Sequence, residues 1–151
     1  MYPTDPEGQL KKREWHRDNH DVHRQDIFVF GSNLSGIHGS GAAYHARHQC
    51  DAIIGDGVGR TGRCYAIPTK NEDISETLDL ATIAVFVRGF LAHAKMNPKT
   101  TFFVTRIGCG LAGLQNADIA PMFADAPENC IMPELWAPFY LPKEQDTLTK
   151  V

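Results

Sequence analysis

Glycines and small polar residues follow an apolar run in FVFGSNLSGIHGSGAAYHARH, residues 28–48. Backbone N–H groups in a glycine-rich loop that leads into a helix can point outward together and bind an anion. Asn33 follows the apolar run, and its amide could hydrogen-bond a ribose or a scissile oxygen, although asparagine is also common in turns. His38 lies among the glycines, where an imidazole can serve as a general acid–base. We call residues 31–41 the first loop, and Asn33 and His38 are its candidate catalytic residues.

A second glycine-rich stretch, RIGCGLAGLQ at residues 106–115, also follows an apolar run, and we call it the last loop. Arg106 and Lys70 each come just after a predicted strand, where their charges could reach a phosphate or a carboxylate. For Lys70, a solvated position on the surface is an equal alternative. Cys109 stands between two glycines without an evident base nearby, so a small packed residue is favoured over a nucleophile. The last loop therefore predicts a second set of amides for the same anion.

A third glycine-rich stretch, residues 55–62, lies between these two and is called the middle loop. Its glycines at 57, 59 and 62 fit the G-x-G-x-x-G pattern of dinucleotide-binding sites, but they lead into a predicted strand and not into a helix. No G-x-x-x-x-G-K-[ST] sequence occurs either, which excludes a P-loop nucleotidase. Glycines of a single loop can serve only in tight turns, but two long loops after buried strands favour a binding site.

Histidines and cysteines offer no predicted metal site. His16, His20 and His23 have the spacing that places three imidazoles on one side of a helix, yet their charged neighbours favour a solvated arm. The four cysteines are spread along the chain without any C-x-x-C pair. They are therefore interpreted as reduced core residues, and neither a disulfide framework nor a zinc ribbon is expected.

Apolar runs alternate with segments of helical periodicity along the chain. Strands are predicted at residues 27–30, 52–54, 64–68, 101–105 and 129–132, and helices from residue 40, at 79–97 and at 117–124. Residues 135–141 could add an edge strand or only cover the core. The alternation predicts an α/β fold with a largely parallel or mixed sheet between helical layers. Because loops at the carboxyl ends of strands line the crevice of such a sheet, the first and last loops should meet at one edge.

The length of 151 residues predicts one domain, preceded by a polar arm at residues 1–25 that could be an ordered extension or mobile. A net charge of −3 gives no general attraction to nucleic acid, so nucleic acid is not an expected partner. No apolar stretch approaches the roughly 20 residues that span a bilayer, and no signal segment is recognised at the N-terminus. A cytoplasmic location without membrane contact is therefore expected, while the oligomeric state stays undecided.

Three motifs resemble macrodomains, and more closely a group of short bacterial and phage macrodomain-like proteins. The first motif of that group reads approximately V-F-G-S-N-L-x-G-x-H-G-x-G-A-A, which residues 29–43 match. The segments YAIPTK at residues 65–70 and VTRIGCGLAG at residues 104–113 are similar to the same group. The resemblance extends from about residue 27 to 133. It implies a three-layer α/β/α macrodomain-like fold with a mixed central sheet, in a single domain at residues 26–151.

Macrodomains bind ADP-ribose and its derivatives between two glycine loops, so the resemblance implies a small ADP-ribose-like ligand and no cofactor. The ligand-binding residues implied are Gly31, Ser32, Asn33, Gly39, Ser40, Gly41, Ala42, Thr69, Arg106, Ile107, Gly108, Cys109, Gly110, Leu111 and Ala112. Asn33 would orient the distal ribose. De-ADP-ribosylating macrodomains carry an acidic residue after the glycines of the first loop, where this chain has Ala42 and Ala43.

Three functions are compatible with these patterns. The first is binding of ADP-ribose or a related NAD-derived nucleotide, with hydrolysis of an ADP-ribosyl bond if the protein is an enzyme. The second is a non-enzymatic sponge or sensor for a nucleotide signal. The third is a structural or interaction protein with a vestigial pocket, whose polar arm contacts a partner.

Overall fold

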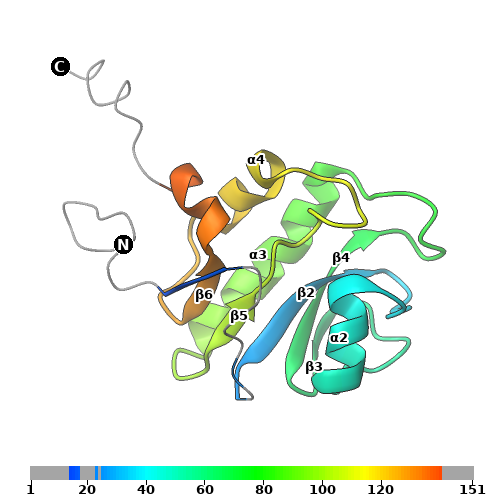
Figure 1. Cartoon of the computed structure of the whole chain (residues 1–151), viewed down its shortest axis with the longest axis horizontal. Coiled ribbons are helices and arrows are strands. Elements are labelled where there is room, and N and C mark those ends of the chain that lie inside the picture. Colours follow the sequence, from blue (N-terminus) through cyan, green and yellow to red (C-terminus); the bar gives the residue numbers. More distant parts are fainter. Residues whose placement is uncertain (1–13, 18–22, 24, 141–151) are drawn as a thin grey trace.

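A mixed β-sheet between helices forms the centre of the computed structural model, which describes residues 14–17, 23 and 25–140 (Figure 1). Within these residues the sheet has six strands in the order β1-β6-β5-β2-β4-β3. The strands are β1 (Trp15–His16), β2 (Ile27–Asn33), β3 (Gly59–Thr61), β4 (Cys64–Lys70), β5 (Phe102–Val104) and β6 (Cys130–Pro133). Neighbouring strands run parallel except for β3, which is antiparallel to β4. The predicted α/β fold with a mixed sheet is confirmed.

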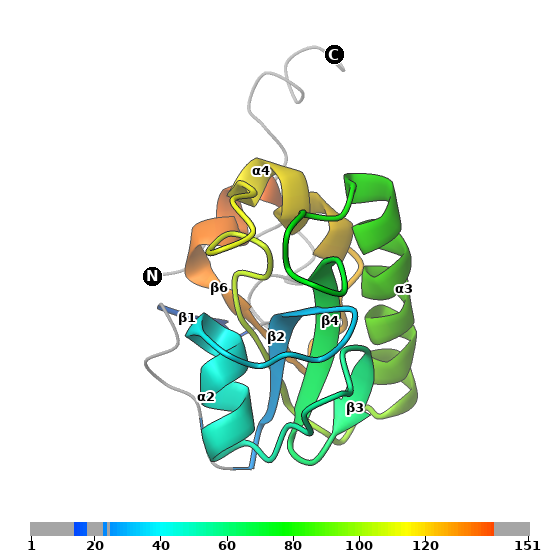
Figure 2. The ribbon, with the colours of Figure 1, turned by 90° about the vertical axis from the view of Figure 1, so that its right-hand side faces the viewer.

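Helices cover both faces of the sheet, which makes three layers (Figure 2). The helical elements are α2 (Gly41–Gln49), α3 (Leu80–Met96), α4 (Asn116–Ile119) and the 3₁₀ helices η1 (Ala120–Phe123) and η2 (Glu134–Phe139). Along β2, Phe28 and Phe30 pack into the core under α2, whereas Ile27 and Val29 pack into the core under α3. Successive side chains of a strand point to opposite faces, so a continuous apolar run is what a doubly covered strand requires.

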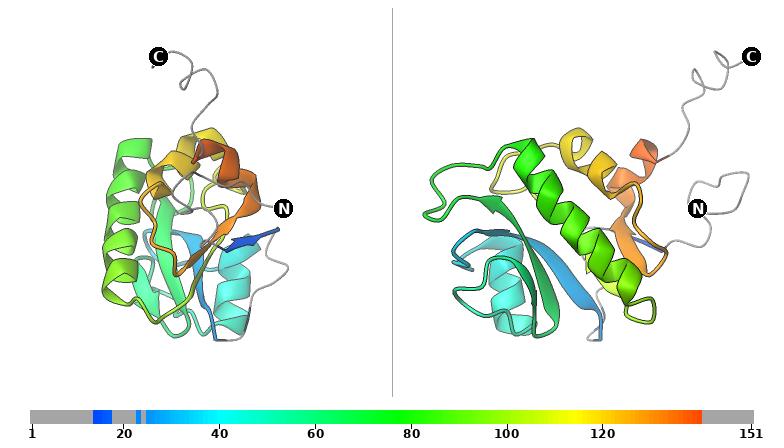
Figure 3. Two further views of the ribbon diagram at one scale, coloured as in Figure 1. Left: turned by 90° about the vertical axis from the view of Figure 1, so that its left-hand side faces the viewer. Right: turned by 180° about the vertical axis from the view of Figure 1, so that it is seen from behind.

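The longest helix, α3, crosses the back of the sheet (Figure 3). Asp79 caps its N-terminus by accepting a hydrogen bond from the backbone N–H of Thr82 at 2.8 Å. The side chains that it buries recur every three or four residues, as the sequence predicts. They are Ile83, Val87, Phe90, Leu91 and Ala94. No helix in the described ranges is both long and apolar enough to cross a membrane.

Part of the polar arm belongs to the sheet. Trp15 and His16 form β1, which pairs with β6, and both side chains are buried. The His16 ring stacks on Phe103 with centroids 4.0 Å apart, and its Nε2 lies 2.6 Å from the carbonyl oxygen of Val104. This stretch is therefore an ordered extension, one of the two alternatives that the sequence left open. Most of the remaining arm lies outside the described residues.

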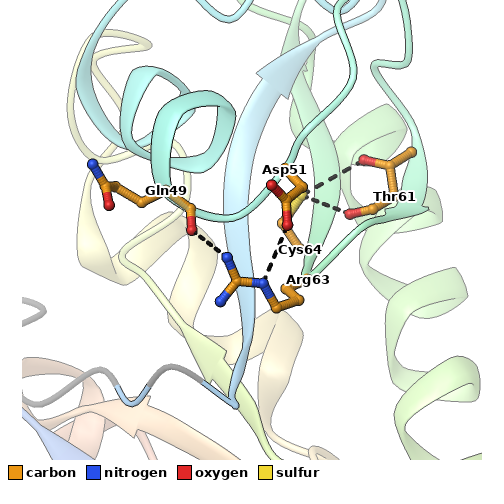
Figure 4. A network of polar contacts seen from close by, with 5 residues as sticks. All are labelled: Gln49, Asp51, Thr61, Arg63 and Cys64. Atoms are coloured by element: carbon orange, nitrogen blue, oxygen red, sulfur yellow. Dashed lines mark hydrogen bonds and ion pairs between the residues drawn. The ribbon is translucent and has the colours of Figure 1, made fainter.

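Arg63 fixes the connection between α2 and β4 (Figure 4). Its guanidinium donates to the backbone oxygen of Gln49 at 2.7 Å and to the carboxylate of Asp51 at 3.2 Å. At the start of β4, the Cys64 thiol donates to the backbone oxygen of Thr61 at the end of β3, at 2.9 Å. These contacts hold the C-terminal end of α2 against the hairpin of β3 and β4.

The prediction of a strand at residues 52–54 is wrong, because this segment is irregular and its two isoleucines are exposed. A strand forms instead at β3, inside the middle loop, where a two-residue turn lets it pair with β4. Gly62 occupies this turn with a φ of +53°, and a Cβ there would lie only 2.7 Å from the Cβ of Asp51. Access to a hydrogen-bonding neighbour, and not the β-propensity of isoleucine, decides which segment becomes a strand.

β2 continues to Asn33, three residues beyond the predicted strand, and two further elements also differ from their predicted form, while the C-terminal segment follows one of its two predicted alternatives. β4 continues past Pro68 to Lys70, because β3 pairs only with residues 64–66 and leaves Pro68 with one strand neighbour, β2. The predicted helix at residues 117–124 is divided into α4 and η1. The C-terminal segment forms η2 and no edge strand, and its fully buried Trp136 covers the core while donating to the Asn116 side chain at 2.9 Å.

Candidate functional site

A cavity of about 460 Å³ opens at the carboxyl ends of β2, β4 and β5. Its walls are the first loop, the end of β4 with the segment that follows, and the last loop. Because these three strands are parallel, the segments that leave them meet at one edge of the sheet. The expected meeting of the first and last loops is confirmed.

Every residue predicted for ligand binding lines this cavity, from Gly31 and Ser32 in the first loop to Ala112 in the last loop. Asn33 lines it as well, whereas His38 does not. The middle loop contributes no lining residue within the described part of the chain. The structure therefore brings together the two distant glycine loops and leaves out one of the two candidate catalytic side chains.

The charged side chains that line the cavity have one sign. Lys70 and Arg106 line it, and none of the described lining residues is an aspartate or a glutamate. The chain as a whole carries a net charge of −3, so this local excess of positive charge runs against the overall balance. Two cations in a concave site favour a ligand with negative charge.

The N-terminus of α2 also faces the cavity, since Ser40, Gly41 and Ala42 line it. Ser40 is the N-cap residue, but its side chain makes no capping hydrogen bond, and the first turn contains no acidic residue. The first N–H groups of a helix have no partner within the helix, and together they carry a partial positive charge. This helix end therefore adds to the attraction for an anion, as the first loop predicted.

Asn33 is buried, and its side-chain amide is bonded within the protein. Its Oδ1 accepts a hydrogen bond from the backbone N–H of Ile37 at 2.7 Å. Its Nδ2 donates to the hydroxyl of Ser35 at 3.1 Å and to the carbonyl oxygen of Glu72 at 3.2 Å. Asn33 thus connects the first loop to the segment that follows β4. This geometry favours a residue that positions the walls over one that orients a ribose through its Nδ2.

His38 is not among the described residues that line the cavity. Its ring is buried, lies edge-on to Phe30 with centroids 5.4 Å apart, and has Nε2 3.1 Å from the carbonyl oxygen of Ile53. The ring therefore packs beneath the first loop and helps to hold the irregular segment at residues 52–54. The sequence pattern could not distinguish an inward-packed imidazole from one that faces a ligand.

Cys109 lines the cavity and is partly exposed. Burial raises the pKa of its thiol, an effect that the nearby charge of Arg106 opposes but does not cancel. The thiol is thus protonated at neutral pH, and its Sγ lies 3.6 Å from the backbone oxygen of Ile107. This environment agrees with the interpretation of a packed residue and not with an activated nucleophile.

Several residues that line the cavity are not among the predicted ligand-binding residues, although the sequence places one of them, Lys70, where its charge could reach a phosphate. They are His16, Ile37, Ala43, Lys70, Ile74 and Thr105. His16 comes from the polar arm, and no periodicity in that arm indicates a place in the sheet. Ile74 belongs to a third wall without glycine, residues 71–76, which we call the Ile74 loop. The turn-forming residues Asn71, Asp73 and Ser75, at every second position, indicate that this segment is a loop.

The middle loop supports the site from outside. Gly57 passes so close to the first loop that a Cβ there would lie 2.0 Å from the backbone oxygen of Asn33 and 2.8 Å from the carbonyl carbon of Leu34. The Ser32 hydroxyl donates to the backbone oxygen of Gly57. The glycines of this loop therefore serve close packing and turns, as the exclusion of a dinucleotide motif predicted.

Among the described residues, no group of three or more potential ligands could hold a metal ion. His16 of the histidine trio is buried in the sheet, and His20 lies outside the described residues. Comparison with protein-family models finds no match for the chain, and comparison with curated proteins finds none either.

Proposed function

We propose that the protein binds ADP-ribose or a related NAD-derived nucleotide in this cavity, with the diphosphate between the first and last loops. The observation that carries the proposal is the charge pattern: Lys70, Arg106 and the uncapped N-terminus of α2 surround a cavity whose described lining has no carboxylate. Charge-assisted hydrogen bonds from such groups are the strongest that a protein offers to a phosphate.

The size and the composition of the cavity support an organic ligand over a bare inorganic ion. A volume of about 460 Å³ lies within the range of small-molecule sites, which are mostly apolar with a few polar groups. Ile37, Ile74 and Leu111 supply apolar surface at the cavity, beside the glycine amides. The macrodomain resemblance selects ADP-ribose among organic anions of this kind.

Binding without hydrolysis is the form of this function that the side chains favour. The amide of Asn33 is occupied by loop contacts, the ring of His38 packs away from the cavity, and the thiol of Cys109 has a raised pKa. A reader, sponge or sensor of a nucleotide needs affinity alone. Micromolar binding requires about −8 kcal/mol, which two amide-rich loops with apolar contacts can supply.

A thermal-shift titration tests the proposal directly, with ADP-ribose, NAD, ADP and cyclic ADP-ribose as separate ligands. A ligand that binds only the folded state raises the melting temperature by an amount that grows with the logarithm of its concentration over its dissociation constant. We expect ADP-ribose to stabilise the protein more than ADP does, and chromatography to recover it intact. Turnover of the ligand would instead make the protein a hydrolase, and absence of stabilisation by all four ligands would contradict the proposal.

A further inference from the structure

Ile74 combines three properties at the tip of the third wall of the cavity. Its φ is +59°, its residue surface is 49% exposed, and it lines the cavity. A β-branched residue at positive φ is uncommon, because its Cβ crowds the backbone carbonyl in the left-handed region. Strain of this kind persists where the surroundings enforce it, and it concentrates at functional sites. The inference below depends on the proposed function.

Hydrogen bonds within the Ile74 loop enforce this conformation. Lys70 and Thr77 close the base of the loop as an antiparallel bridge. Asn71 spans the interior: its backbone oxygen accepts from the N–H of Ile74 at 3.2 Å, and its side chain contacts both Ser75 and Glu76. Beside the tip, the Asp73 carboxylate accepts two hydrogen bonds from Ser75. The backbone around Ile74 is therefore fixed by polar contacts that do not involve its own side chain.

The same loop is tied to both other walls. The carbonyl oxygen of Glu72 accepts hydrogen bonds from the side chains of Asn33 and Ser35 in the first loop. The hydroxyl of Thr77 donates to the backbone oxygen of Ala112 in the last loop at 2.8 Å. These connections hold the tip in place relative to the phosphate-binding amides. Ile74 is thus presented at the cavity in advance of any ligand.

Two further apolar side chains face solvent at the cavity from the other walls. Ile37 in the first loop is 49% exposed, and Leu111 in the last loop is 71% exposed. Leu111 approaches the start of α2, since a Cβ on Gly41 would lie 3.9 Å from its Cδ1. Each wall therefore contributes one exposed aliphatic side chain to a cavity that also contains anion-binding groups.

We propose that Ile74 contacts the organic part of a bound organic diphosphate, and that its strained backbone positions it for this contact at the expense of stability. The amides and cations of the cavity suit the diphosphate, whereas an isoleucine adds nothing to the binding of an inorganic anion. The residue therefore contributes to the selection of a nucleotide or sugar diphosphate over pyrophosphate.

The test compares three variants of the full chain. Ile74→Gly removes both the side chain and the strain, Ile74→Ala removes the contact but keeps a Cβ at positive φ, and Ile54→Gly removes an equally exposed isoleucine that does not line the cavity. Without ligand, we expect Ile74→Gly to raise the melting temperature by about 2–4 °C, and Ile74→Ala to raise it less. Both Ile74 variants should bind ADP-ribose about tenfold more weakly, while Ile54→Gly should bind it like the wild type.

Inorganic pyrophosphate is the second probe, and its affinity should be the same for the wild type and for both Ile74 variants. Unchanged affinity of Ile74→Gly for ADP-ribose would overturn the inference while leaving the proposed function intact. An equal loss of affinity for pyrophosphate would overturn it too, since the substitution would then have disturbed the anion site. A wild-type protein that binds neither probe would refute the proposed function itself.

Discussion

Asn33 shows at the scale of one residue how a side chain can line a cavity while its amide is bonded within the protein. Its amide links Ile37 of the first loop and Glu72 of the Ile74 loop, and it is 3% exposed. The sequence predicts a catalytic role for this residue, and an asparagine beside glycines looks the same whether its amide binds a ligand or the neighbouring loops. The burial of Asn33 and its hydrogen bond to Glu72 form only when the segment after β4 folds against it, so the sequence pattern does not predict them.

Replacement of Asn33 by alanine should therefore lower stability as well as binding. Asn33→Ala leaves the backbone N–H of Ile37 without its acceptor, and we expect the free energy of unfolding to fall by about 1–3 kcal/mol. Urea denaturation measures this change. A matched variant, Ser35→Ala, removes the donor to Glu72 and the acceptor of one Asn33 Nδ2 hydrogen bond, but leaves Asn33 bonded to Glu72 and Ile37, and should cost less. Unchanged stability of Asn33→Ala together with lost ADP-ribose binding would instead indicate direct contact with the ligand.

At the scale of elements, backbone approach decides what the glycines do. The sequence predicts three glycine loops and places the first and last at one edge of the sheet; these two line the cavity, and the middle loop packs beside it. In the middle loop, Gly57 touches the backbone of Asn33, whereas in the last loop a Cβ on Gly110 would have nothing within 4 Å. Both loops are rich in glycine, and the path of the chain decides which of them faces the cavity.

Gly57→Ala should destabilise the protein by more than about 2 kcal/mol, because the added methyl collides with backbone atoms that cannot rotate away. The control is Gly89→Ala in α3, where the nearest atom to the added Cβ is the hydroxyl of Tyr65 at 4.0 Å. Alanine at this helical position should raise stability by roughly 0.5–1 kcal/mol. Chemical denaturation of both variants checks the pair. Equal stability of Gly57→Ala and the wild type would show that the two loops can separate at little cost.

Across the whole molecule, the sequence predicts the α/β class, a largely parallel or mixed sheet, and the meeting of two loops at one edge of that sheet. These follow from hydrophobic period and from the rules of parallel sheets, which act over the entire chain. The position of β1 could not be predicted, because its two residues, Trp15 and His16, lie in a polar arm and depend on a partner strand more than a hundred residues away. The strand at residues 52–54 gives way to β3 for a different reason, because β3 finds its pairing partner in the adjacent β4 through a two-residue turn.

Cys50 and Cys64, which are buried in the core under α2, make the stability of the fold depend on pH in the alkaline range. Burial, followed by the nearby Cys64, raises the pKa of the Cys50 thiol from 9.0 to about 11. A thiol with a raised pKa favours the folded state below pH 9, and this contribution is lost as the pH rises from about 9 to 11. We expect the free energy of unfolding to fall by up to about 2–3 kcal/mol over that window through this group. Denaturation of the wild type and of Cys50→Ala at pH 8 and 10.5 measures it, and an equal decline in both would contradict the assignment.

The most direct test of the account is calorimetric titration of ADP-ribose into the wild type, Gly110→Glu and Gly110→Gln. A side chain at residue 110 meets open space, so both variants should fold, and they differ only by one negative charge at the cavity. We expect micromolar binding at one site for the wild type, similar binding for Gly110→Gln, and binding at least about tenfold weaker for Gly110→Glu. Equal affinities of the two variants, or no binding by the wild type at millimolar ligand, would contradict the claim that this cavity binds an organic diphosphate.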